Sequence, residues 1–228
     1  MVVVTDTCRG HGHREFVLEA DEGHVPSVYL ENVAQTIERM VAAGSVFRPG
    51  ETFQIGWMLT RVESYGDDRL TLVEPDMRSM PMRFVRGISE TLRQMMLQLF
   101  MLDSVSLRVE IDIPLAQHSL VACTRYTEPA FFMTRSAPGD EHDSGWFVGC
   151  LADDHDHDAA SNLTRVSLYE AFVRQPGIQG FLGFPVGSLI AVDPRAGVRI
   201  YKGEQELPVE PDSFLDAWTK RLAADHGQ

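Results

Sequence analysis

The chain of 228 residues lacks most of the features that mark secreted or redox-active proteins. It contains 3 Cys, an odd number at wide spacing with no C-x-x-C pair, so neither a disulfide framework nor a short redox or zinc motif is predicted. Lysine occurs only at Lys202 and Lys220, so arginine carries nearly all of the positive charge. The lack of a disulfide framework is consistent with a reducing cytoplasm.

Long apolar runs are also missing. Val2–Val4 is too short to form the apolar core of a signal peptide, and no other stretch approaches the length of a membrane span. We therefore expect a cytoplasmic protein that has no membrane partner.

Positive charge is scarce relative to negative charge. The chain has 20 Lys+Arg against 33 Asp+Glu, which gives a formal net charge of -13. Such a protein repels nucleic acid and anionic membranes and attracts basic partners. Its 44% hydrophobic and 23% charged residues are otherwise ordinary for a globular protein.

Common catalytic and nucleotide-binding motifs are absent. The glycines between Gly177 and Gly187 do not form G-x-G-x-x-G, and there is no Walker loop or H-E-x-x-H. Ser144 is not in a G-x-S-x-G elbow, and Cys150 is more simply interpreted as a buried small hydrophobe than as a nucleophile. We expect a protein without cofactor that is not an enzyme.

Hydrophobic periodicity predicts the first half of the chain. Phe53, Ile55, Trp57 and Leu59 alternate strictly with Gln54, Gly56, Met58 and Thr60, which predicts a strand. Thr52–Glu74 is expected to form a hairpin. Apolar residues at helical spacing predict helices over 31–43 and from Phe84 to Leu102. With a strand over 14–20, residues 1–113 read as a β-α-β-β-α domain, and residues 1–12 as a loose leader.

The second half is rich in strand signals separated by turns, and Pro114 marks its expected beginning. A strand expected over 107–113 ends the first domain. In the second half, strands are expected over 120–125, 130–134, 145–150, 188–192 and 198–201, and helices over 167–174 and from Asp212. The fold class is therefore predicted as α+β, with two antiparallel sheet-plus-helix subdomains at 1–113 and 114–228.

Carboxylates, imidazoles and a tryptophan gather between Asp140 and Asp158. One interpretation is a solvated acidic loop beside a core tryptophan. The other is a partner-binding surface in which the carboxylates meet arginine or lysine and the tryptophan is the aromatic anchor. The residues assigned to that surface are His142, Asp143, Trp146, Asp153, Asp154, Asp156 and Asp158.

Two other interpretations remain open. His142, His155 and His157, with the intervening aspartates, supply donors for zinc, manganese or iron, which would suit a metal-dependent hydrolase. In an extended segment, His155 and His157 would face the same side. The methionines Met95, Met96 and Met101 lie at helical spacing and suit core filling or an adaptable groove for an oligomeric partner.

The stretch from Ser119 to Asp193 resembles family thirty-three of the bacterial polymorphic-toxin immunity proteins. The resemblance is carried by Asp143-Ser144-Gly145-Trp146, by Gly149, by Asn162-Leu163 and by the run Phe181-Leu182-Gly183-Phe184-Pro185-Val186-Gly187-Ser188. It implies a non-enzymatic protein that protects its producer by binding a cognate toxin. The acidic composition agrees with a toxin that is basic at the contact surface.

Overall fold

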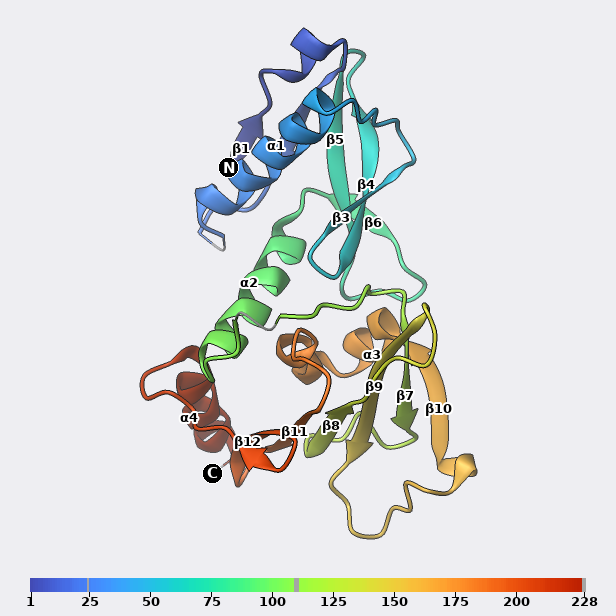
Figure 1. Cartoon of the computed structure of the whole chain (residues 1–228), viewed down its shortest axis with the longest axis vertical. Helices are drawn as coiled ribbons and strands as arrows, with labels where there is room; N and C mark the ends of the chain where they lie inside the picture. Colours follow the sequence, from blue (N-terminus) through green and yellow to red (C-terminus); the bar gives the residue numbers. More distant parts are fainter. Residues whose placement is uncertain (24, 109–110, 227–228) are drawn as a thin grey trace. The chain divides into compact units, whose positions relative to one another are not determined.

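The computed structural model describes residues 1–23, 25–108 and 111–226, and it divides into two compact units, Met1–Met95 and Met96–Gln228. Each unit contains a β-sheet and helices (Figure 1), so the predicted α+β class is confirmed. The division falls within helix α2 (Ser89–Asp103), earlier than the boundary suggested by Pro114. Among the described residues, no helix is both long and apolar enough to cross a bilayer.

The sheet of the first unit has the strand order β1-β2-β5-β4-β3, with β6 paired to β5. Its elements are β1 (Val2–Val4), η1 (Cys8–His11), β2 (Glu15–Glu19), α1 (Ser27–Ala42), β3 (Thr52–Ile55), β4 (Met58–Tyr65), β5 (Arg69–Pro75) and β6 (Phe84–Arg86). Helix α1 is amphipathic and buries Leu30, Ile37 and Val41. The expected loose leader instead supplies strand β1, which pairs antiparallel with β2.

The alternation from Phe53 to Leu59 spans a tight turn, so the single strand expected there is wrong. Ile55 of β3 lies opposite Met58 of β4, and Gly56 between them has φ +57°. Glycine adopts this backbone conformation at little cost because it has no Cβ. β3, β4 and β5 consequently form a three-stranded meander in place of the expected hairpin.

Helix α2 begins at Ser89, later than the helix predicted from Phe84. Residues Phe84–Arg86 instead form β6. The buried Glu74 carboxylate accepts hydrogen bonds from the N–H groups of Glu90 at 3.0 Å and Thr91 at 2.6 Å. These are N–H groups of the first helical turn that lack intrahelical partners, so a residue of β5 caps the helix and defines where it starts.

The second unit contains a seven-stranded sheet in the order β10-β7-β9-β8-β11-β12-β13. Its elements are β7 (Ser119–Cys123), β8 (Phe131–Arg135), β9 (Asp143–Cys150), η3 (Ala160–Asn162), β10 (Leu163–Ser167), α3 (Leu168–Arg174), η4 (Pro176–Phe181), β11 (Ser188–Asp193), β12 (Gly197–Lys202), β13 (Gln205–Glu206) and α4 (Phe214–His226). The strand expected over 107–113 includes residues 109–110, which lie outside the described residues, and the described residues beside them are not in a strand.

Both sheets are mixed, which corrects the expectation of purely antiparallel subdomains. β2 runs parallel to β5, and β7 runs parallel to β9, whereas the other strand pairs of the described chain are antiparallel. In the second unit, β8 and β9 form a hairpin whose returning strand lies between β8 and β7. β9 is therefore antiparallel to β8 on one side and parallel to β7 on the other.

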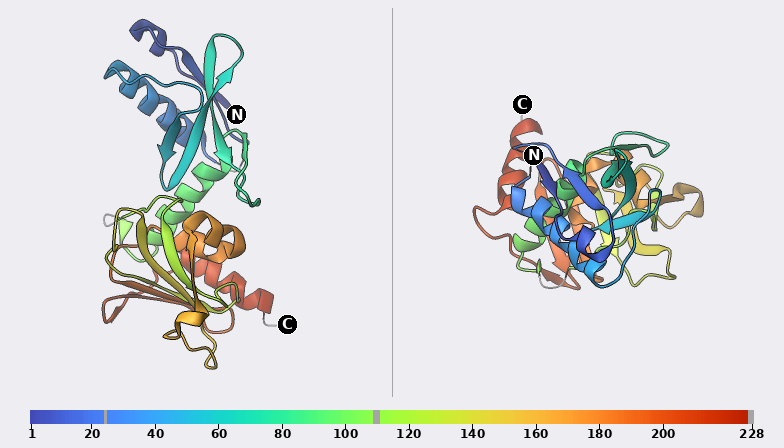
Figure 2. Two further views of the ribbon diagram at one scale, coloured as in Figure 1. Left: turned by 90° about the vertical axis from the view of Figure 1, so that its right-hand side faces the viewer. Right: turned by 90° about the horizontal axis from the view of Figure 1, so that it is seen from above.

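The two faces of the second sheet differ in their covering. The helices of this unit lie on one side of the sheet (Figure 2), where Met133, Trp146 and Ile190 are buried. Side chains alternate between the faces along each strand. Phe132, Phe147 and Leu189 therefore point to the opposite, open face, where the two phenylalanines are half-buried and Leu189 is 37% exposed.

Candidate functional site

Two buried thiols meet at one edge of the second sheet. Cys123 ends β7 and Cys150 ends β9, and because these neighbouring strands are parallel, both ends lie at the same edge. The backbone N–H of Cys150 donates to the Cys123 sulfur at 3.2 Å, although the residues are 27 positions apart. The relative exposure is 0% for Cys123 and 1% for Cys150. The parallel pairing of the strands is what assembles this pair.

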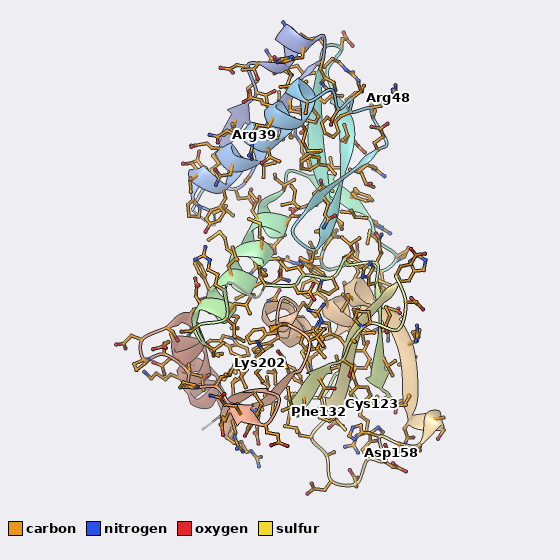
Figure 3. All side chains as sticks on the ribbon, in the orientation of Figure 1. Arg39, Arg48, Cys123, Phe132, Asp158 and Lys202 are labelled. Carbon is orange, nitrogen blue, oxygen red and sulfur yellow. The ribbon has the colours of Figure 1, made fainter. Side chains whose placement is uncertain are left out.

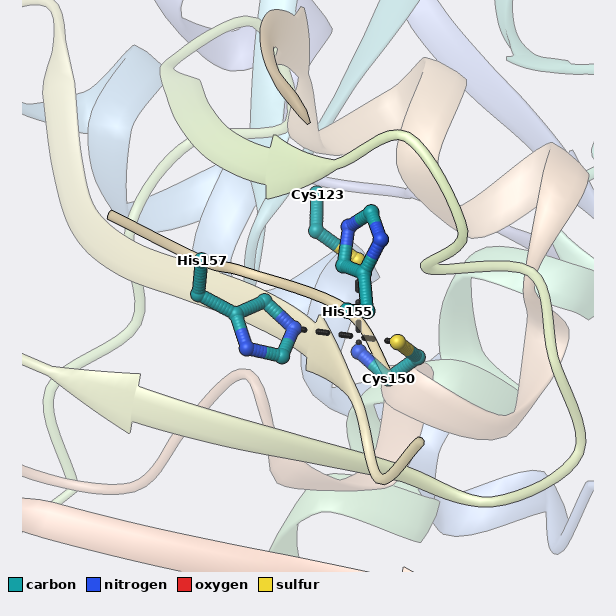
Figure 4. Close-up of side chains that lie close together, drawn as sticks. All are labelled: Cys123, Cys150, His155 and His157. Atoms are coloured by element: carbon teal, nitrogen blue, oxygen red, sulfur yellow. Dashed lines mark hydrogen bonds between the residues drawn. The ribbon is translucent and has the colours of Figure 1, made fainter. Parts of the chain in front are cut away.

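The loop after β9 carries two imidazoles to the same edge (Figure 4). Nε2 of His157 lies 3.7 Å from the Cys150 sulfur, and the rings of His155 and His157 have centroids 4.9 Å apart. The His157 ring also contacts Phe132 and Phe147 edge-on, at centroid distances of 5.3 and 6.0 Å. These contacts fix the loop against the open face of the sheet.

The four side chains present two sulfur and two nitrogen donors. One donor atom from each of Cys123, Cys150, His155 and His157 lies within 4.8 Å of the other three. Thiolate and neutral imidazole are the donors that zinc prefers. Nε2 of His155 is buried and has no hydrogen-bond partner in the described part of the chain. The cluster therefore has the composition and spacing of a metal site.

The protein environment alone disfavours a reactive thiolate. Burial raises the pKa of the Cys123 thiol, and the backbone N–H groups of Cys150 and Arg125 only partly oppose that shift. Thiolate is the form that attacks electrophiles and binds metal. A cation bound in the cluster would stabilise the thiolate. Without a cation, the raised pKa of the Cys123 thiol disfavours a Cys-His nucleophile.

In the acidic loop, which we define as Asp153–Asp158, the aspartates and the histidines differ in their exposure to solvent. Asp153, Asp154, Asp156 and Asp158 are exposed, whereas His155 and His157 are half-buried and turn toward the sheet. This agrees with the expectation that both imidazoles face one side. Figure 3 shows Cys123, Phe132 and Asp158 near the same end of the sheet.

Polar contacts hold the backbone of the acidic loop in place. Arg125 Nη1 donates to Asp154 at 2.7 Å, and Asn162 Nδ2 donates to the carbonyl of Asp156 at 2.9 Å. The Asp156 carboxylate accepts the N–H of Asp158 at 2.9 Å. The carboxylates are thus displayed from an ordered segment.

Trp146 is a core residue, so its expected role as an exposed anchor is wrong. It is 2% exposed, and its indole N–H donates to the carbonyl of Leu182 at 3.3 Å. The guanidinium of Arg135 lies 5.6 Å from its ring centroid. The alternation along β9 turns Trp146 toward the helices and its neighbour Phe147 toward the open face.

His142 and Asp143 lie at the other end of β9 from the cysteines. Strand β9 separates His142, which precedes it, from Cys150 at its far end, so the expected triad of His142 with His155 and His157 does not assemble. The His142 side chain is 84% exposed and lies 3.7 Å from Glu141. Two cysteines replace it in the cluster.

Asp143 has a structural environment. Its carboxylate accepts the N–H groups of Gly139 at 2.8 Å and Gly145 at 3.0 Å. Burial raises the pKa of this carboxyl, but the two N–H donors, together with the charges of Arg165 and His118, outweigh that effect and the net pKa is lowered. Asp143 therefore stays ionised to hold the turn before β9, which leaves its oxygens engaged inside the protein.

The Asp143-Ser144-Gly145-Trp146 motif is explained by packing. Ser144 Oγ donates to the carbonyl of Ser119 at 2.8 Å. Gly145 has φ +73°, and a Cβ there would lie 2.1 Å from the carbonyl oxygen of Ser136. A Cβ at Gly149 would lie 2.4 Å from the Phe132 ring. These motif residues shape the strand that carries Cys150 to the sheet edge.

Sequence reasoning missed Cys123 as part of the site. The sequence predicts strands over 120–125 and 145–150, which contain Cys123 and Cys150, but it does not predict their parallel pairing. The available signal was that each strand ends at or near a cysteine and that the acidic loop follows the second. Pattern alone could not place the two ends side by side, because strand order is a tertiary property.

Comparison with known proteins gives no assignment: no protein-family model, curated protein or solved structure matches this chain. The resemblance of Ser119–Asp193 to the immunity family stays a prediction that depends on the quoted motifs.

Proposed function

We propose that this protein is a cytoplasmic immunity protein that binds a cognate bacterial toxin and blocks its functional surface, without a reaction of its own. The resemblance of the second half to toxin-immunity proteins supports this role. The net charge of -13 also supports it, because an acidic inhibitor is attracted to a basic toxin.

The acidic loop is the observation that carries the proposal. Four carboxylates, from Asp153, Asp154, Asp156 and Asp158, point to solvent within six consecutive residues. Only Asp154 has an arginine partner among the described residues, namely Arg125. A toxin that acts on nucleic acid needs cationic side chains to hold phosphates. The carboxylates that have no arginine partner can form ion pairs with those cationic side chains in place of the phosphates.

The open face of the sheet supplies an aromatic surface beside this loop. Phe147 lies opposite Thr134, which lies opposite Leu189, and Val121 lies on the other side of Phe147. Aromatic residues are enriched in interface cores, and the surrounding carboxylates form a polar rim. Phe147 thereby takes the anchoring role first expected of Trp146, from the opposite side of the strand.

Co-purification tests the proposal. The chain is used as bait against the polymorphic toxin encoded beside its gene, and cell survival on co-expression is scored. We expect a complex that weakens as salt increases, since exposed charges are screened. Absence of a complex, with toxicity unrelieved, would overturn the proposal.

A charge-matched pair of variants locates the contact. The first replaces Asp153, Asp156 and Asp158 by Asn, and the second replaces the exposed Glu31, Asp67 and Glu204 by the corresponding amides. Both change the net charge equally. We expect the first to slow association about tenfold or more and the second to have a much smaller effect. Equal effects would show that only overall charge matters.

A further inference from the structure

We infer that Cys123, Cys150, His155 and His157 bind one zinc ion that fastens the acidic loop to the end of the sheet. Their placement is specific: two ligands come from the ends of parallel strands and two from the loop that follows β9. The inference concerns this metal site alone and is independent of the proposed toxin-binding role.

The distances suit a tetrahedral ion. Zinc bound to two sulfurs at about 2.3 Å and two nitrogens at about 2.0 Å places its donor atoms roughly 3.3–3.8 Å apart. The donors here lie within 4.8 Å of one another, and Cys150 Sγ and His157 Nε2 are already 3.7 Å apart. Side-chain rotations that move the donor atoms by about 1 Å would bring them to the donor–donor distances of a tetrahedral site, and such movements lie within ordinary rotamer freedom.

The unpartnered nitrogen of His155 is a second observation that points to an ion. Its Nε2 is buried, and in the described part of the chain it has no hydrogen-bond partner. A buried polar atom without a partner costs free energy. Coordination to a metal held by the neighbouring thiols would remove that cost.

The charge balance also fits. Each thiol releases its proton to solvent when zinc binds, so the dication and two thiolates form a neutral buried centre. The exposed carboxylates of Asp154, Asp156 and Asp158 point away from the cluster and attract cations to its vicinity without serving as ligands. The acidic surface therefore keeps its charge when the site is filled.

Four protein ligands define a structural site. A catalytic zinc ion keeps a coordination position open for water or substrate, which a Cys2His2 set does not. The effect of the ion is to cross-link the acidic loop, which has no regular secondary structure, to the ends of β7 and β9. This assigns the Cys/His cluster a stabilising role in place of the hydrolase chemistry that the histidines alone suggested.

Metal titration of the full-length, reduced protein tests the site. Zinc alone is titrated in competition with a chromophoric chelator, and Co2+ alone is used as a spectroscopic probe. We expect one ion per chain, with intense d–d bands of tetrahedral Co2+ and thiolate charge-transfer absorption. Folded protein that takes up no ion, or that gives weak octahedral Co2+ bands without charge transfer, would overturn the inference.

Two histidine variants complete the test. His157→Gln removes a half-buried ligand, and His142→Gln removes an exposed histidine outside the cluster. We expect zinc affinity to fall about a hundredfold or more in the first and to be unchanged in the second. Equal affinity in both variants would overturn the inference. Because the readout is metal binding, failure here leaves the toxin-binding proposal untouched, and absence of a toxin complex leaves the metal site untouched.

Discussion

The N–H of Cys150 donates a hydrogen bond of 3.2 Å to the sulfur of Cys123, which ties the ends of two parallel strands together at the base of the acidic loop. This relationship links the structural core of the second unit to its most charged surface. A metal bound by the same sulfurs would determine how firmly the acidic loop is held to the end of the sheet.

Metal removal should therefore loosen the acidic loop and leave the sheet intact. In amide hydrogen exchange, we expect protection at residues 151–158 to fall about tenfold or more when zinc is chelated, because the loop loses its cross-link and has few backbone hydrogen bonds of its own. Protection in β8 and β11 should change little. Uniform loss across the second unit would show that the ion supports the whole fold.

Alanine substitutions at the neighbouring residues Trp146 and Phe147 should have different effects on the free energy of unfolding and on toxin affinity. Trp146→Ala opens a cavity in the core and should lower the free energy of unfolding by about 3–5 kcal/mol. Phe147→Ala removes a partly exposed ring and should cost about 1 kcal/mol, while weakening the toxin complex about tenfold or more.

Urea denaturation and toxin titration of both variants check this division. The assignment of Phe147 to the interface fails if Phe147→Ala binds toxin as tightly as the unaltered protein. A folded Trp146→Ala should still bind, since its side chain lies under the opposite face of the sheet.

The sequence predicts most of the strands and helices of the second unit, because alternation and turn residues are local signals. It does not predict which face of β9 is buried: alternation sets Trp146 and Phe147 on opposite sides, but only the position of the helices decides between them. The same limit applies to Phe53–Leu59, where Gly56 reverses the chain without disturbing the alternation.

Half of the metal-site residues follow from the sequence. The spacing of His155 and His157 predicts that they share a side. The identity of their partners depends on β9 lying between β7 and β8, so Cys123 could not be chosen over Cys8 or His142. In the first unit, the start of α2 likewise depends on Glu74, a residue of another strand.

Gly145 should be intolerant of a side chain. In Gly145→Ala, the new Cβ would lie 2.1 Å from the Ser136 carbonyl oxygen at a φ of +73°, so we expect a loss of unfolding free energy of about 3 kcal/mol or more. Gly187→Ala is the matched control, because Gly187 has φ +89° and a Cβ added there would have no atom within 4 Å. It should cost about 1–2 kcal/mol from the backbone alone. Similar losses in urea denaturation would show that the start of β9 moves away from Ser136 and relieves the clash.

Glu15 should give the first unit a pH-dependent stability. Burial raises the pKa of this carboxyl, but hydrogen bonds from Thr5 Oγ1 at 2.5 Å and the N–H of Arg9 at 2.8 Å contribute to a net pKa that is lowered. A carboxyl with a lowered pKa in the folded state stabilises that state above its unfolded pKa of about 4.3. The stabilisation is lost as pH falls through the folded-state pKa.

Comparison with Glu15→Gln isolates this contribution. At pH 7 the variant should be less stable by about 1–2 kcal/mol, because a neutral amide is a weaker acceptor for the two donors. The difference should shrink as pH falls below the unfolded-state pKa and through the lowered folded-state pKa of Glu15, because the carboxyl of the unaltered protein is then protonated. Denaturation of the two proteins at a series of pH values checks the sign, and a difference that grows toward low pH would contradict a lowered pKa for Glu15.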